Sequence, residues 1–125
     1  MPQKHYLCIG KNVFEKMVVK FDKEYLADLY YKGQSRDKKH RFRPDIIERY
    51  KRRIDILCSA TCIESLYRIH SLRYEVLRGD KAGISSIRVN DRYRIEFIVG
   101  QERDAAGTEK EITICNIIEL SNHYE

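Results

Sequence analysis

Residues 84 to 99, ISSIRVNDRYRIEFIV, contain the pattern that most restricts how this chain can fold. Two runs rich in β-branched and aromatic residues flank a polar stretch, which predicts a β-hairpin. A loop of Asn90 and Asp91 alone would mix charged and apolar side chains on each face. A loop from Asn90 to Arg92 sorts them, and it gathers on one face Ile87, Val89, Tyr93, Ile95 and Phe97. A buried face requires such sorting, so the longer loop is predicted, with Asn90 or Asp91 in the left-handed conformation.

The opposite face of this hairpin is charged. It carries Ser86, Arg88, Arg94 and Glu96, with the two arginines directly across from each other. Like charges in paired positions repel unless a negative group lies close to both. That group is either a carboxylate, with Glu96 or Glu119 as candidates, or a phosphate, which the planar fork of arginine binds through two parallel hydrogen bonds. The residues alone leave both interpretations open.

The first half of the chain has the spacing of helices. Asp22 is placed to cap a first helix, which follows a short strand at residues 17 to 21 and ends at Gly33. The apolar face of this helix consists of Leu26, Leu29 and Tyr30. Pro44 begins a second helix, whose apolar stripe consists of Ile47, Tyr50, Ile54 and Leu57.

The order of the elements indicates the fold class. Thr61 and Glu64 have the spacing of a capping box, which predicts a short third helix. The segments ISSIRVN, RYRIEFIV and EITICNIIEL then read as strands. Helices followed by strands predict an α+β fold, in which the N-terminal helices pack on one face of a small antiparallel sheet.

The length of 125 residues fits one domain. Residues 1 to 16 lack a clear periodicity, and Met17 directly precedes the first ordered segment. Residues 1 to 16 are therefore either an N-terminal extension or a segment upstream of a translation start at Met17. Residues 17 to 125 are expected to form the single domain.

The net charge indicates a class of binding partner, and the cysteine pattern indicates a cellular compartment. The net charge of +5 favours an acidic partner, such as nucleic acid or an acidic protein. The four cysteines form no C-x-x-C pair, and the chain has neither a signal-peptide pattern nor an apolar run of membrane-spanning length. A cytoplasmic protein without a metal site is expected.

The run VLRGDKAGISSIRVNDRYRIEF resembles the core of the RelE/ParE superfamily of toxins from type II toxin-antitoxin systems, in particular the HigB-type (plasmid maintenance killer) branch. The likeness lies in the Gly-Asp turn, the Ser-Ile-Arg-Val strand and the aromatic-Arg-Ile strand. It implies a RelE-like fold and, as partner, an antitoxin that often has a helix-turn-helix domain. It also implies an endoribonuclease that cuts messenger RNA on the ribosome, without metal or cofactor, by attack of a 2′-hydroxyl on the neighbouring phosphate.

Such a reaction needs cationic donors, a base and an acid, and the resemblance suggests residues for each role. Arg94 is expected to bind the phosphate, with Arg88 next and Arg78 as a stabilising charge before Gly-Asp. The tail departs from relatives that end in a triplet such as Asp-Tyr-His. His123 is the candidate for proton transfer and Tyr124 for base stacking or proton donation. Glu119 is the candidate for orienting them. Glu75 stands where some relatives have a catalytic histidine, and no role is expected for His5, His40 or His70.

A basic region follows the first helix. It is either a solvated surface or a contact with ribosomal RNA. Its candidate RNA-binding residues are Lys38, Lys39, Arg41, Arg43, Arg49, Arg52 and Arg53. Two further candidates, Lys81 and Arg92, lie outside this region, near the hairpin.

Two other functions fit the same residues. ParE-type members of the superfamily inhibit DNA gyrase by binding it. A catalytically inactive module that only binds an antitoxin would use Arg88 and Arg94 as docking residues instead.

Overall fold

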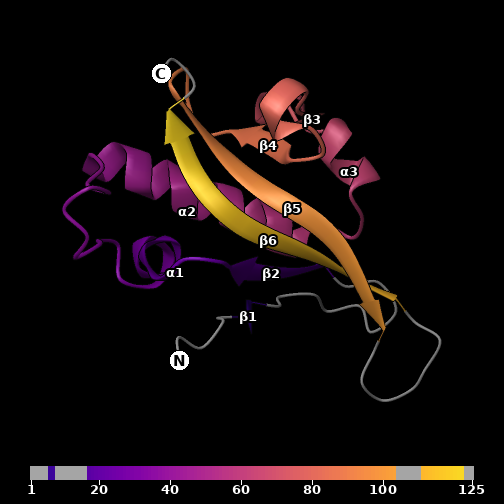
Figure 1. The fold of residues 1–125 in the computed structure, drawn as a ribbon, viewed down its shortest axis with the longest axis horizontal. Helices are drawn as coiled ribbons and strands as arrows, with labels where there is room; N and C mark the ends of the chain where they lie inside the picture. The colour runs from indigo at the N-terminus through magenta and orange to yellow at the C-terminus, as the bar shows by residue number, and fades with distance from the viewer. Residues whose placement is uncertain (1–5, 8–16, 104–110, 123–125) are drawn as a thin grey trace.

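The computed structural model describes residues 6–7, 17–103 and 111–122, which form an α+β fold as predicted. The elements are β1 (Tyr6–Leu7), β2 (Met17–Phe21), α1 (Glu24–Tyr31), α2 (Pro44–Ser59), α3 (Glu64–Tyr67), the 3₁₀ helix η1 (His70–Leu72), β3 (Glu75–Val76), the 3₁₀ helix η2 (Gly79–Lys81), β4 (Ser85–Arg88), β5 (Tyr93–Arg103) and β6 (Glu111–Asn122). Figure 1 shows α2 crossing one face of the sheet, with α1 beside it. None of the helices within the described ranges is long and apolar enough to span a membrane.

The strands form one sheet in the order β1-β2-β6-β5-β4-β3. The long strands β5 and β6 lie at its centre and pair antiparallel. The pair β2 and β6 is parallel, with Met17 opposite Thr113, so the expectation of a purely antiparallel sheet is wrong at this point. The helices and three strands that separate β2 from β6 provide the long connection that a parallel pair requires.

The predicted hairpin register is confirmed. Ile87 pairs with Ile95, Arg88 pairs with Arg94, and the loop comprises Asn90 to Arg92. The predicted left-handed residue is wrong, because Arg73 is the single non-glycine residue with a positive φ among those described. The side chain of Asn90 closes the loop instead, since its Oδ1 accepts hydrogen bonds from the backbone N–H of Arg92 at 2.9 Å and of Tyr93 at 2.7 Å.

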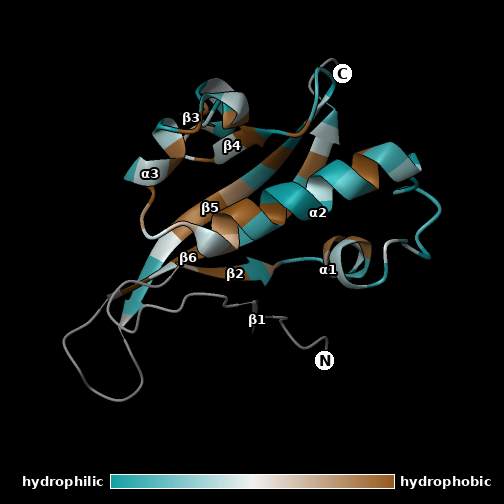
Figure 2. Ribbon diagram, turned by 180° about the vertical axis from the view of Figure 1, so that it is seen from behind, coloured by the Kyte–Doolittle hydropathy of each residue, from teal (hydrophilic) through white to brown (hydrophobic). Residues whose placement is uncertain are grey.

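The core lies between the helices and the predicted apolar face of the sheet. Figure 2 shows the apolar side of α2 turned toward β5 and β6. From the helices this core receives Leu26, Leu29, Ile46, Tyr50, Ile54 and Leu57, and from the hairpin Ile87, Val89, Ile95 and Phe97. Ile47 packs only at its margin, and Ile46 takes the buried place. The Tyr50 hydroxyl donates to the Leu26 carbonyl at 2.8 Å, which joins α2 to α1.

The predicted helix ends are confirmed in part. α2 begins at Pro44, and Gly33 follows α1 with a φ of 71°, which favours glycine. Asp22 does not cap α1, since the N-cap position is Lys23 and no side chain makes a capping hydrogen bond there. The backbone N–H of Asp22 donates to the Ile117 carbonyl at 2.8 Å, so this residue still belongs to the sheet. The predicted capping box of Thr61 is wrong as well, since α3 begins one residue after Ile63 without a side-chain cap.

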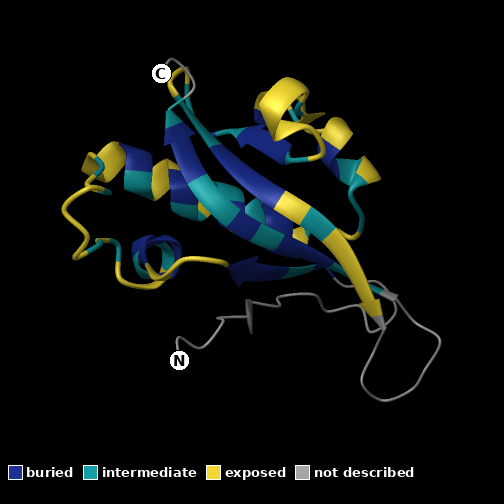
Figure 3. Ribbon diagram, viewed as in Figure 1, coloured by how far each residue is buried: buried dark blue, intermediate teal, exposed yellow. Residues whose placement is uncertain are grey.

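The second face of the sheet is partly covered near the β4 edge. The loop from Leu77 to Ile84, which joins the edge strand β3 to β4, lies there, and Figure 3 shows this loop exposed beside buried parts of β4 and β5. The Leu77 N–H donates to the Ile84 carbonyl at 2.8 Å, which closes the loop at its base. Gly79 has a φ of 73°, so the Gly-Asp motif turns the chain at this point. Beneath the loop, Ser86 and Glu96 are buried although they belong to the polar face.

Candidate active site

A pocket of about 380 Å³ lies between the β3–β4 loop, β5 and the end of β6, and is here called the Arg94 pocket. Its lining residues are Leu77, Arg78, Asp80, Lys81, Arg94, Glu96, Ser121 and Asn122. The loop approaches from one side, and the paired strands form the floor. The fold therefore brings three of the predicted site residues together: Arg94, Arg78 and Lys81.

Arg94 projects from β5 beneath the loop, with 14% of its side chain exposed. Its Nη1 lies 3.3 Å from Glu75 Oε1 and donates to Ser86 Oγ at 3.2 Å. Glu75 is therefore the carboxylate partner of Arg94, and the expected partners Glu96 and Glu119 are not. Both contacts are made by Nη1, on a side chain that lines the Arg94 pocket.

Glu96 is a buried carboxylate in the pocket floor, with 5% of its side chain exposed. Its Oε2 accepts a hydrogen bond from Lys81 Nζ at 2.8 Å and another from Ser121 Oγ at 2.9 Å. A buried carboxylate requires such partners. The hydrogen bond to Glu96 raises the pKa of Lys81, so the ammonium stays charged at neutral pH. Lys81 can therefore stabilise negative charge, but it is poorly suited to supply a proton.

Arg78 is a third cation of the pocket, and it differs from Arg94 and Lys81 in lacking a carboxylate partner among the described residues. It is exposed, and its side chain makes no hydrogen bond or ion pair with the rest of the described chain. Arg78 and Lys81 line the pocket from the β3–β4 loop, and Arg94 lines it from β5. Such an arrangement suits a phosphate group, whose oxygens accept hydrogen bonds from several cationic donors. No cluster of His, Cys, Asp and Glu that could hold a metal ion occurs within the described ranges.

Arg88 lies in a different pocket, although it pairs with Arg94 across the strands. Its Nη2 binds Asp91 Oδ1 in the hairpin loop. The pocket here called the Arg88 pocket has a volume of about 370 Å³, and its lining residues are Asp45, Arg49, Arg88, Asn90, Asp91 and Arg92. The prediction that Arg88 and Arg94 act together on one group is not supported by this geometry, because the two side chains diverge.

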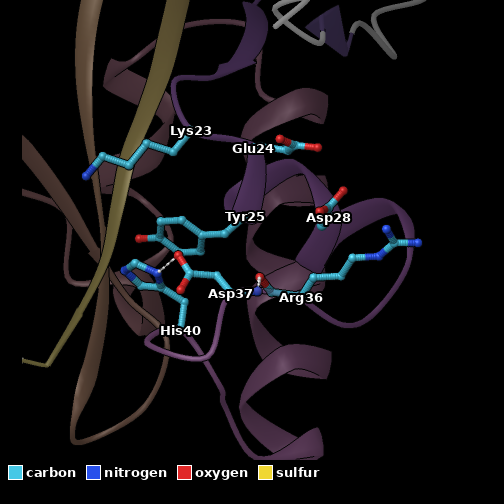
Figure 4. Close-up of a pocket in the computed structure, with 8 residues that line it drawn as sticks. Lys23, Glu24, Tyr25, Asp28, Arg36, Asp37 and His40 are labelled. Atoms are coloured by element: carbon cyan, nitrogen blue, oxygen red, sulfur yellow. Dashed lines mark hydrogen bonds and ion pairs between the residues drawn. The ribbon is translucent and has the colours of Figure 1, made fainter.

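A third pocket, of about 420 Å³, lies beside α1 (Figure 4). His40 Nδ1 lies 2.7 Å from Asp37 Oδ2, and the imidazole stacks on the ring of Tyr25 with 3.7 Å between centroids. The Tyr25 hydroxyl accepts the Leu120 N–H at 3.4 Å, and burial raises the pKa of Tyr25 to about 12. These contacts connect the segment before α2, through Tyr25, to β6 at Leu120, beyond the last residue that pairs with β2. His40, for which no role was predicted, thus has a packing role.

The remaining predicted site residues lie apart from the Arg94 pocket. Glu119 pairs with Glu96 across β5 and β6 but does not line the pocket. Of the predicted RNA-binding residues in the basic region, those that are exposed are Lys38, Lys39, Arg41, Arg43, Arg49 and Arg52. Arg43 pairs with Asp45, Arg52 pairs with Glu48, and the Arg53 Nε donates to the Arg88 carbonyl. His123 and Tyr124 lie outside the described residues.

Sequence reasoning missed part of the pocket. Glu96 was considered only as a partner for the arginines, and its burial beneath the loop could not be read from strand alternation. Ser121 aligns with the last residue of the polar triplet at which relatives end, but no role was predicted for it, and Asn122 carried no signal beyond its place at the end of β6. Glu75 did carry a sequence signal, because it stands ahead of Arg78 at the position where some relatives have a histidine.

Comparisons with known proteins concern most of this chain. A family model described as RelE-like toxin of type II toxin-antitoxin system HigB matches residues 19–116. Among solved structures, the chain is similar to a YoeB/ParE toxin from Agrobacterium tumefaciens, with 19% sequence identity, a TM-score of 0.44, and coverage of 85% of this chain and 98% of that chain. No curated protein sequence matches. The family match includes the loop and β5 of the Arg94 pocket but ends before Ser121 and Asn122.

Proposed function

Because this chain belongs to the HigB-like family of RelE-like toxins from type II toxin-antitoxin systems, we propose that it is an endoribonuclease that cleaves messenger RNA on the ribosome and so inhibits translation. Family membership makes it a toxin and implies an antitoxin protein as its partner. RNA cleavage at the Arg94 pocket goes beyond family membership and is what we propose.

The observation that carries the proposal is the convergence of Arg78, Lys81 and Arg94 on one pocket. Lys81 is held by the carboxylate of Glu96, and Arg94 is held by that of Glu75, so the positions of these two cations are fixed before a ligand binds. Preorganised donors of this kind stabilise charge that develops in a transition state. The charge that they suit is that of a phosphodiester under attack.

The proposed reaction is a transfer within the RNA strand. The ribose 2′-oxygen attacks the adjacent phosphorus, the bond from phosphorus to the 5′-oxygen breaks, and the products end in a 2′,3′-cyclic phosphate and a 5′-hydroxyl. Arg94 and Arg78 bind the phosphate oxygens, and Lys81 adds positive charge beside them. The 2′-hydroxyl loses its proton to a base, and the departing 5′-oxygen gains one from an acid.

Two sources of proton transfer are proposed. Glu75 does not line the pocket, but it is half exposed and its carboxylate lies 3.3 Å from Arg94, which does, so we propose it as the base that accepts the 2′-hydroxyl proton. His123 and Tyr124 follow Asn122, which lines the pocket, and we retain them as candidates for the acid and for base stacking. Glu119, on the strand before them, would orient this tail.

The partners follow from the same proposal. The antitoxin would carry a helix-turn-helix domain and would neutralise the toxin by covering the Arg94 pocket. Residues 17–125 would form the toxin domain, and the cations of the basic region, which extends from the segment before α2 into α2, would contact ribosomal RNA.

The test is a reconstituted bacterial translation reaction with purified protein, followed by primer extension on a defined messenger RNA. The proposal predicts truncated transcripts with ribosomes and intact transcripts without them. Supercoiling by purified gyrase, assayed in parallel, should be unaffected. Intact messages together with inhibited gyrase would instead support the ParE-type function, and neither effect would leave an antitoxin-binding module.

A further inference from the structure

We propose that the Arg88 pocket is a second phosphate-binding site, which holds the backbone of an RNA strand away from the Arg94 pocket. This inference rests on the proposed function, since it assumes that RNA is the substrate. It changes the role of Arg88 from catalysis to substrate binding.

The pocket is built at the point where the sheet edge is open. β3 pairs with β4 only at Ser85 and Ser86, so the edge at Arg88 has no strand beside it. Arg53 of α2 takes this place, and its Nε donates to the Arg88 carbonyl at 2.9 Å. This contact joins α2 to the end of β4, and Arg49 of α2 and Arg92 of the hairpin loop line the same pocket.

The arginines of this pocket are more numerous than their acidic partners. Arg88 binds Asp91, and Asp45 is engaged by Arg43 outside the pocket. Arg49 and Arg92 are exposed, and their side chains make no hydrogen bond or ion pair within the described ranges.

Electrostatics at Arg53 point in the same direction. Burial together with the positive charges of Arg49 and Arg88 lowers the pKa of Arg53, so the cations repel one another. An anion between α2 and the hairpin would relieve this repulsion.

The composition of the walls favours a nucleic acid backbone over a protein. Every lining residue is charged or carries an amide. Protein partners are usually anchored by apolar and aromatic side chains in the interface core, and this pocket offers none. Phosphate groups need only the guanidinium donors. Because Arg88 and Arg94 are paired positions, a single RNA strand that crosses the hairpin would contact both pockets.

The experiment measures binding of a labelled single-stranded RNA by fluorescence anisotropy over a range of salt concentrations. The RNA is fully 2′-O-methylated, so it cannot be cleaved by 2′-hydroxyl attack. Wild type is compared with the double variant Arg49→Gln, Arg92→Gln. The matched control is Arg68→Gln, which removes the same kind of exposed charge next to α3, far along the chain from the pocket. Thermal unfolding of each variant verifies that it is folded.

The double variant should bind about tenfold more weakly at low salt, and the slope of log affinity against log salt should fall by about 1.4, as expected for two lost phosphate contacts on a single strand. The control should stay within about twofold of wild type. Equal affinities and slopes for the double variant and the control would overturn the proposal. So would the absence of RNA binding by wild type. Binding to uncleavable RNA is independent of Arg94 chemistry, so failure of the proposed nuclease activity would show separately in the translation assay.

Discussion

Arg88 and Arg94 face each other across β4 and β5, but Arg88 binds Asp91 in the hairpin loop while Arg94 binds Glu75 of β3. Like charges in paired positions are unfavourable unless each finds a negative partner. Here each arginine has its own carboxylate, and the two guanidiniums turn to opposite ends of the hairpin. One strand pair thus supplies two separate cationic pockets.

This divergence predicts different losses for the two arginines. Arg94→Lys should lower the rate of messenger RNA cleavage by about 10²-fold or more, since a planar donor to the developing phosphate charge is lost. Arg88→Lys should weaken RNA binding and leave the rate at saturating RNA within a few-fold of wild type. Single-turnover cleavage over a range of protein concentrations separates the two effects. Equal losses of rate would mean that the arginines act on one phosphate.

Glu75→Gln tests whether this carboxylate accepts a proton or only neutralises Arg94. We expect the cleavage rate to fall by about 10²-fold or more, the usual effect of removing a general base. RNA affinity should be unchanged or higher, because the variant frees a positive charge. Rate and affinity are measured on the same message. A cleavage rate that rises together with affinity would limit Glu75 to a partner of Arg94.

Lys81→Met should destabilise the fold, because it leaves Glu96 with only Ser121 as a donor. We expect a loss of about 1–2 kcal/mol in the free energy of unfolding. This loss is smaller than that expected for a fully buried ion pair, because Lys81 is half exposed and solvent screens its charge. Urea unfolding of Lys81→Met, Glu96→Gln and the double variant gives the coupling energy. Additive losses would contradict a direct interaction.

The raised pKa of Lys81 sets the pH window of that contribution. A lysine whose pKa is higher in the folded state contributes fully below its unfolded value of about 10.4, and the contribution disappears as the pH rises through the folded value. The difference in stability between wild type and Lys81→Met should therefore be constant from about pH 6 to pH 9 and should shrink in stronger alkali.

The raised pKa of Tyr25 leads to a second prediction about stability at alkaline pH. Burial raises its pKa from 10.0 to about 12, so the folded state keeps the hydroxyl proton that the unfolded state loses. Stability should therefore fall as the pH rises from about 10 to about 12, and it should fall less in Tyr25→Phe. At neutral pH the variant should lose about 1 kcal/mol, since the Leu120 N–H loses its acceptor. Identical alkaline slopes for the two proteins would contradict this account.

Much of the fold could be predicted because local patterns determine it. The hairpin register followed from sorting Ile87 and Ile95 away from Arg88 and Arg94, which a buried face enforces. Pro44 and Gly33 marked helix ends through their own backbone preferences. The parallel pairing of β2 with β6 was not predictable in this way, because it joins segments far apart in the sequence and has no local signature.

The candidate site was predicted less completely. Arg94, Arg78 and Lys81 were identified and lie together. Arg88 was assigned to the same site because alternation gives the face of a strand but not the direction of a long side chain. Glu96 was missed as a site residue because its burial depends on the β3–β4 loop, whose path over the sheet is a tertiary feature.

The most direct test of the central claim is ribosome-dependent cleavage of a defined messenger RNA by wild type, Arg94→Ala and the control Arg68→Ala, with the ends of the products identified. We predict that wild type and the control produce fragments that end in a 2′,3′-cyclic phosphate, and that Arg94→Ala, although folded, produces none. Cleavage by Arg94→Ala at the wild-type rate would contradict the assignment of the Arg94 pocket as the active site.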